Sequence, residues 1–180
     1  DRVDSIPEKS TRTGYYMKKL LRNDVRINND GSVVIKKHCD IYMRYTELYL
    51  ILAEAANEIG GPDHAVGGIS ARDVLAEIRE RAGITQPDNY LASISSQEDM
   101  RALIRNERRI ELCFEGHRFW DLRRWGLPLN ETVTGYFNNG SGYVEIPVVE
   151  TRDYPEYARY MPIPYSEIIK FSALEQNQGW

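Results

Sequence analysis

Apolar and polar residues in the stretch 100–125, MRALIRNERRIELCFEGHRFWDLRRW, recur with the period of an amphipathic helix. At about 100° per residue, one face of such a helix collects apolar side chains and must face a core. The same stretch holds seven arginines and no lysine, and Gly116 is expected to break the helix. The apolar positions of this face are Met100, Leu103, Ile104, Ile110 and Phe114.

Two carboxylates, Glu107 and Glu111, fall in the middle of that apolar face. A buried carboxylate is costly unless it is paired, and a planar guanidinium pairs with it through two charge-assisted hydrogen bonds. The arginines of the same turns project to the other side, so the partners must come from elsewhere. We assign Glu107, Glu111, Arg118 and Arg124 to a structural ionic latch, a set of buried ion pairs between helices. The sequence does not choose among the available arginine donors, which are Arg79, Arg81, Arg118, Arg123 and Arg124.

The alternative interpretation of Glu107 and Glu111 is an acid/base or metal-binding pair. Such a site needs an open position for substrate or water, whereas apolar residues and arginines surround these two carboxylates. The chain also lacks a nucleophile elbow, a phosphate-binding loop and zinc-ligand spacing, and His117 has no partner at a useful spacing. We therefore expect no catalytic residue, no metal and no cofactor.

Two further helices are expected before this one. Residues 42–61 are apolar on nearly every side and predict a buried helix that ends at Gly60 and Gly61. Its Tyr45, Tyr49 and Leu52 have the spacing of either core residues or an aromatic ligand stripe, and we favour the core. A second helix is expected over residues 71–82, with Ser70 as its N-cap, and Ser95 or Ser96 should cap the third.

Short hairpins are expected outside the helices. Asp30-Gly31 separates two β-branched runs, and Asn138-Asn139-Gly140 separates TVTGYF from YVEIPV, where Pro147 should mark an edge or strand end. Near the carboxy terminus, Ser166 should cap a short helix. The predicted fold class is mainly α, with packed helix pairs, short hairpins and long loops in one domain over residues 1–180.

The second hairpin is the expected place of any ligand contact. An aromatic ring offers an apolar face to the C–H face of a sugar, and amides bond hydroxyl groups in both senses. The alternative is that these residues only build the hairpin, because hairpins use the same residue types. The candidate ligand-binding residues are Tyr136, Phe137, Asn138, Asn139 and Tyr143.

Composition narrows the function further. A net charge of −4 and a pI near 5.5 argue against a general nucleic-acid binder, which needs a basic surface. No run of 18 apolar residues occurs, and the chain opens at Asp1 without a signal segment, so we expect an excerpt of a longer protein. Cys39 and Cys113 are too few for a disulfide framework.

The run IRNERRIELCFEGHRFWDLRRWG, residues 104–126, resembles the signature of the SusD/RagB family, the surface nutrient-binding lipoproteins of Bacteroidetes outer membranes. RYTELYLILAEAANEIGG, residues 44–61, is similar to the family's corresponding helix. PIPYSEI and LEQNQGW look like its carboxy-terminal pattern, with Gln178 where the family more often has proline. The resemblance covers most of residues 42–180.

The resemblance implies a helical domain packed beside tetratricopeptide-like helices in an amino-terminal part outside this chain, which would also carry the lipid anchor. It implies a non-catalytic receptor at the cell surface of the outer membrane that binds a glycan or oligosaccharide ligand and passes it to a SusC-like TonB-dependent transporter. The open alternatives are a peptide-binding member of the same family and a helical adaptor that binds only proteins. A carboxylate-pair glycoside hydrolase is the least favoured.

Overall fold

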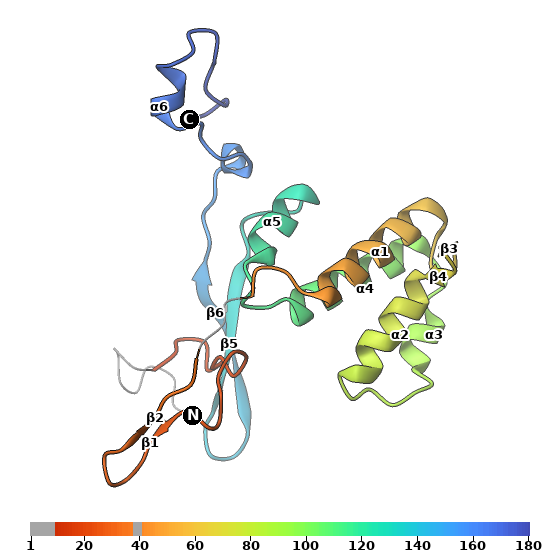
Figure 1. Ribbon diagram of the computed structural model, residues 1–180, viewed down its shortest axis with the longest axis vertical. Helices are drawn as coiled ribbons and strands as arrows, with labels where there is room; N and C mark the ends of the chain where they lie inside the picture. Colours follow the sequence, from red (N-terminus) through yellow and green to blue (C-terminus); the bar gives the residue numbers. More distant parts are fainter. Residues whose placement is uncertain (1–9, 38–40) are drawn as a thin grey trace. The chain divides into compact units, whose positions relative to one another are not determined.

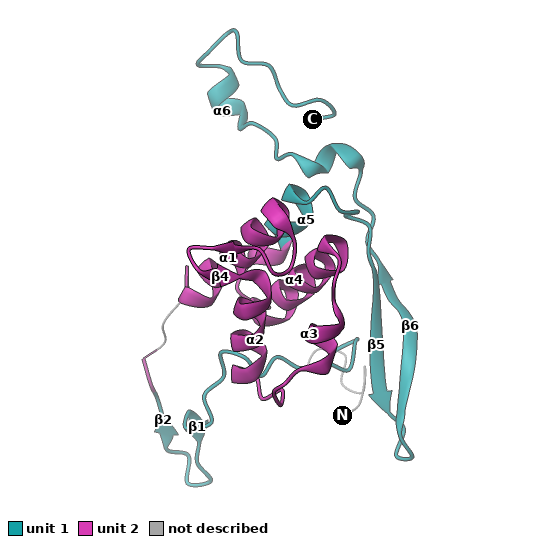
Figure 2. Cartoon of the chain, turned by 90° about the vertical axis from the view of Figure 1, so that its right-hand side faces the viewer, with its two compact units in different colours: residues 1–35, 119–180 teal, residues 36–118 magenta. Residues whose placement is uncertain are grey.

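The computed structural model describes residues 10–37 and 41–180 and divides into two compact units, coloured separately in Figure 2. Unit 1 comprises residues 1–35 and 119–180, and unit 2 comprises residues 36–118. Cys39 lies outside the described residues. Whether residues 1–180 fold as one domain stays a prediction.

Unit 2 is a small helical bundle. Its helices are α1 (Tyr45–Gly60), α2 (Ala71–Arg81), α3 (Asn89–Ser93) and α4 (Gln97–Glu111), and its strands β3 (Ala65–Val66) and β4 (Ile69–Ser70) form a short hairpin (Figure 1). Helix α1 packs against both α2 and α4. The predicted mainly helical fold is confirmed. The buried core of the unit includes Leu50, Ala53, Val74, Leu75, Ile78, Met100, Leu103 and Ile104.

The helix boundaries of unit 2 follow the capping signals in the sequence. Ser70 and Asp73 form a reciprocal capping box at the start of α2. Ser96, one of the two serines expected there, accepts a hydrogen bond from the Asp99 N–H and caps α4. Helix α3 was not expected, and it forms because the Asp88 carboxylate accepts from two backbone N–H groups of its first turn.

Two expectations about buried faces are wrong. Helix α1 buries only one side in unit 2, and Leu48, Ile51 and Ile59 remain exposed there. Helix α4 ends at Glu111, so Phe114, with a positive φ of 62°, no longer follows the helical period and is 63 % exposed. Ile110, in the last turn, is also exposed.

Helix α5 (His117–Arg124) spans the boundary between the two units. It follows Gly116, whose φ of +82° fits the expected helix break. Of the large apolar residues in and just after this helix, only Leu122 is buried, and Trp120 is 59 % exposed. The two arginines that end this helix lie over aromatic rings, Arg123 at 3.5 Å from the Phe119 centroid and Arg124 at 4.4 Å from that of Trp125.

Unit 1 contains both predicted hairpins. Strands β1 (Arg26–Ile27) and β2 (Val33–Val34) pair around Asp30-Gly31, and β5 (Thr132–Asn138) pairs with β6 (Tyr143–Thr151). Pro147 lies inside β6, where the register shifts, and β6 is an edge strand of a two-stranded sheet, so Pro147 marks an edge and not a strand end. The unit also holds a 3-10 helix, η1 (Glu156–Arg159), and α6 (Tyr165–Ile168), which has Pro164 rather than Ser166 at its N-cap position.

The amino-proximal segment of unit 1 contacts both strands of the β5–β6 hairpin. The Tyr136 N–H donates to the Thr13 carbonyl oxygen at 2.8 Å, and the Arg12 guanidinium donates to the Val149 carbonyl oxygen at 3.0 Å. Gly135 makes this approach possible, because a Cβ there would lie 2.7 Å from the Thr13 oxygen.

None of the described helices combines the length and apolar character needed to cross a membrane.

Candidate functional site

The Glu107 carboxylate lies in a buried ion-pair triad that joins α2, α3 and α4. Arg79 donates through Nε to Asp88 Oδ2 at 2.5 Å and through Nη1 to Glu107 Oε1 at 2.6 Å. The side chains of Asp88 and Glu107 are only 5 % and 10 % exposed. The hydrogen bond from Arg79 lowers the pKa of Asp88 below its usual value, although burial opposes the shift.

The Glu111 carboxylate is held by two arginines from different segments. Arg81, at the end of α2, donates to Glu111 Oε1 at 2.5 Å, and Arg44, just before α1, donates to the same oxygen at 2.8 Å. Arg44 also donates through Nε to both oxygens of Glu115, at 3.0 and 2.9 Å. These contacts connect the start of α1 and the end of α2 to the end of α4.

Arg79 and Arg81 were among the donors that the sequence left open, and Arg44 was not. No local pattern marks Arg44, because it precedes its helix and meets Glu111 only through the tertiary fold. Arg124, which we had assigned to the latch, donates to Asp121 within α5 at 2.8 Å. Arg118 lies half-buried near the start of α5. The structural role of Glu107 and Glu111 stays an interpretation, and their engagement by arginines is consistent with it.

The five predicted ligand residues lie at the tip of the β5–β6 hairpin. Tyr136 is opposite Glu145, and Asn138 is opposite Tyr143, so Tyr136, Asn138 and Tyr143 share one face of the hairpin. Tyr143 is 76 % exposed and Tyr136 is 37 % exposed. Phe137 points to the other face, where it is half-buried opposite Val144.

The two asparagines build the turn. Asn138 Oδ1 accepts from the Gly140 N–H at 2.8 Å, and Asn139 Oδ1 accepts from the N–H groups of Ser141 and Gly142 at 2.9 and 3.0 Å. These are the side-chain to backbone bonds that favour asparagine in tight turns. Their carbonyl oxygens are therefore already engaged, and the amide NH₂ groups are the parts suited to meet a ligand hydroxyl.

The structure adds two residues to this face that the sequence did not indicate. The rings of Tyr15 and Tyr136 meet edge to face, with centroids 6.2 Å apart, and Tyr15 is 61 % exposed. The negative charge of Glu145, opposite Tyr136, raises the pKa of the Tyr136 phenol. Only the pairing register could have indicated Glu145, and nothing in the sequence places Tyr15 beside β5. We call Tyr15, Tyr136, Asn138, Tyr143 and Glu145 the hairpin face.

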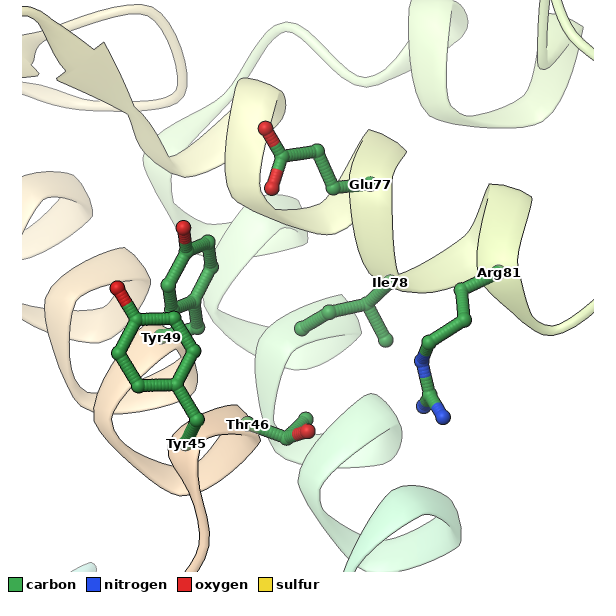
Figure 3. Close-up of a pocket in the computed structure, with 6 residues that line it drawn as sticks. All are labelled: Tyr45, Thr46, Tyr49, Glu77, Ile78 and Arg81. Carbon is green, nitrogen blue, oxygen red and sulfur yellow. The ribbon is translucent and has the colours of Figure 1, made fainter.

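A second concave feature lies in unit 2, between α1 and α2. It is a cleft of about 190 Å³ (Figure 3). The Tyr45 and Tyr49 rings lie on the α1 side with centroids 4.8 Å apart, and Glu77 extends from α2 on the opposite side. A hydrogen bond with the Tyr45 hydroxyl, together with the charge of Glu77, raises the pKa of Tyr49. The remaining lining residues are Thr46, Ile78 and Arg81.

Comparisons with known proteins agree with this architecture. The model of the SusD family matches residues 2–180. SusD-like protein P2 of Formosa agariphila is 35 % identical over 141 residues, which cover 76 % of this chain and 25 % of that protein. The chain thus spans about a quarter of the length of this relative.

Two solved structures share the fold over most of the chain. A SusD-like protein from Bacteroides fragilis superimposes with a TM-score of 0.63 at 34 % identity, over 78 % of this chain and 26 % of that one. The structure of BT4246 gives a TM-score of 0.77 at 26 % identity, over 95 % of this chain and 29 % of that one. The match over nearly all residues and the shared helical architecture lead to one conclusion: this chain belongs to the SusD family.

Proposed function

We propose that the protein is a non-catalytic nutrient receptor of the outer membrane, exposed at the cell surface, that captures oligosaccharides through the hairpin face. Membership of the SusD family supports the receptor role. The observation that carries the glycan assignment is the grouping of exposed tyrosines with an amide and a carboxylate on one side of the β5–β6 hairpin.

The chemistry of the hairpin face suits a sugar. The rings of Tyr143 and Tyr136 can cover the C–H face of a pyranose, and Tyr15 supports the Tyr136 ring edge to face. Glu145 can accept hydrogen bonds from sugar hydroxyls, and the NH₂ group of Asn138 can donate to them. Both polar groups lie directly opposite a tyrosine in the strand register, so one sugar unit can meet a ring and a polar group together.

The captured oligosaccharide would pass to a SusC-like TonB-dependent transporter. A lipid anchor on a part of the protein outside this chain would hold the receptor at the membrane. Both proposals rest on family membership alone.

The arrangement of the carboxylates favours binding over hydrolysis. A glycoside hydrolase needs two carboxyl groups that face one pocket with room for substrate or water. Glu107 and Glu111 instead accept hydrogen bonds from Arg79, Arg81 and Arg44. A peptide-binding receptor and a helical protein-binding adaptor remain the competing functions, and no contact in the hairpin face favours either of them.

A glycan-array screen of the 180-residue chain tests the proposal. We expect binding to one class of oligosaccharide, and a loss of roughly tenfold or more in affinity for the double variant Tyr136→Ala Tyr143→Ala, since each aromatic platform contributes on the order of 1 kcal/mol. Tyr165→Ala is the matched control, because Tyr165 is 75 % exposed on α6, outside the hairpin. Binding of peptides alone would replace the glycan assignment, and unchanged glycan affinity in the double variant would remove the hairpin face from it.

A further inference from the structure

The cleft between α1 and α2 presents a carboxylate that its surroundings do not neutralise. Among the residues that the structure describes, Glu77 forms no ion pair and its side chain is exposed. Arg81, one turn further along the same helix and also in the cleft lining, donates to Glu111 instead. In Figure 3, Glu77 extends from α2 on the side of the two tyrosine hydroxyls, and Arg81 lies at the other end of the cleft.

Two charged residues line the cleft, Glu77 and Arg81, and they are not paired with each other. Arg44 and Arg81 are cations, and both bond to Glu111, while Arg44 also bonds to Glu115. In the described part of the chain Glu77 has no ion pair, and the Tyr45 and Tyr49 rings in the same cleft add the negative faces of their π systems.

Aromatic rings beside an unpaired carboxylate favour the binding of an organic cation, through cation–π contacts and a charge-assisted hydrogen bond. The floor of the cleft includes Ile78, which is 5 % exposed and apolar, and so suits methylene groups. The volume of about 190 Å³ is smaller than the roughly 300–1,000 Å³ of ordinary small-molecule sites, so it fits one side chain rather than an oligosaccharide.

We propose that this cleft binds the side chain of a lysine in a peptide segment, with the ammonium group at Glu77 and the methylene chain between Ile78 and the tyrosine rings. The contact is distinct from glycan capture at the hairpin face and does not depend on it. It gives unit 2 a recognition site for a basic peptide.

The proposal is tested by titrating the ¹⁵N-labelled 180-residue chain with Nα-acetyl-lysine methylamide and monitoring the amide signals by two-dimensional NMR. The matched probe is Nα-acetyl-norleucine methylamide, which keeps the methylene chain and lacks the charge. We expect saturable shifts of the Glu77 and Tyr49 amides with the lysine probe, weakened by added salt, and little change with norleucine. Equal binding of both probes, or no binding of lysine at millimolar concentration, would overturn the proposal.

Two charge-neutralising variants locate the contact. Glu77→Gln should weaken lysine binding roughly three- to fivefold, the size expected of an exposed ion pair. Glu80→Gln removes an exposed carboxylate of the same helix, outside the cleft lining, and should leave binding unchanged. Lysine binding that is insensitive to Glu77→Gln contradicts the proposal, and so does a preference for glucosamine over the lysine probe. Glycan affinity, measured on the same samples, should be unaffected by either variant.

Discussion

Replacing Arg79 with methionine should strongly destabilise the helical unit. The Asp88 and Glu107 side chains are 5 % and 10 % exposed, and each accepts a short hydrogen bond from Arg79, at 2.5 and 2.6 Å. Methionine keeps much of the aliphatic stem and removes the charge, so two buried carboxylates lose their shared cation. Breaking a buried ion pair in this way costs about 3–5 kcal/mol, which for a chain of this length lowers Tm by roughly 6–20 °C.

The loss of stability in Arg79→Met should be larger at neutral pH than at acidic pH. Arg79 lowers the pKa of Asp88 below its ordinary value of 3.8, so the pair stabilises the fold above that pH and the contribution is lost as the pH falls through the lower folded value. The variant lacks this contribution. The difference in stability between wild type and Arg79→Met should therefore be largest near neutral pH and should narrow below about pH 4.

Thermal unfolding followed by circular dichroism at 222 nm measures this effect, because the longest helices, α1 and α4, belong to unit 2. Arg109→Met is the matched control, since Arg109 lies exposed on α4 and makes no ion pair in the described part of the chain. If Arg79→Met loses no more stability than Arg109→Met, or if its deficit is the same at pH 3 and pH 7, the buried triad does not contribute as argued.

Two further substitutions test local features of the fold. Ser70→Ala removes the capping box of α2 and should lower the free energy of unfolding by about 1 kcal/mol, measured by chemical denaturation. The control is Ser95→Ala, at an exposed serine that caps no helix, which should leave the free energy of unfolding almost unchanged. Equal effects of the two variants would contradict the capping role of Ser70. Gly135→Val places a Cβ 2.7 Å from the Thr13 carbonyl oxygen and should release the segment around Thr13 from β5. The Tyr136 amide, which donates to that oxygen, should then exchange its hydrogen faster. Unchanged exchange would refute the contact.

Local signals predicted the elements well. Ser70 and Ser96 begin their helices because a side-chain oxygen satisfies free backbone N–H groups, and that chemistry is readable from a few neighbouring residues. Asp30-Gly31 and Asn138-Asn139-Gly140 produced the expected hairpins for the same reason. The helical periodicity and the family signature over residues 104–126 both indicated the mainly helical fold class, which the structural relatives confirm.

The tertiary contacts of individual residues could not be predicted from the sequence in the same way. The helical period continued through Phe114 in the sequence, but the chain leaves α4 after Glu111 and Phe114 adopts a positive φ. Arg44 meets Glu111 across 67 residues of sequence, and Tyr15 meets Tyr136 across unit 1, so no local spacing encodes either contact. The apolar residues of α1 indicated burial on all sides, yet unit 2 covers only the face around Leu50 and Ala53.

We propose that the protein binds a glycan at the hairpin face without cleaving it. Calorimetric titration with the best oligosaccharide from the array, followed by chromatography of the same sample, tests both parts at once. We predict saturable binding that is lost in Tyr136→Ala Tyr143→Ala, with the oligosaccharide recovered intact. Equal affinity in the double variant would contradict the site, and shorter products in the wild-type sample would contradict the receptor function.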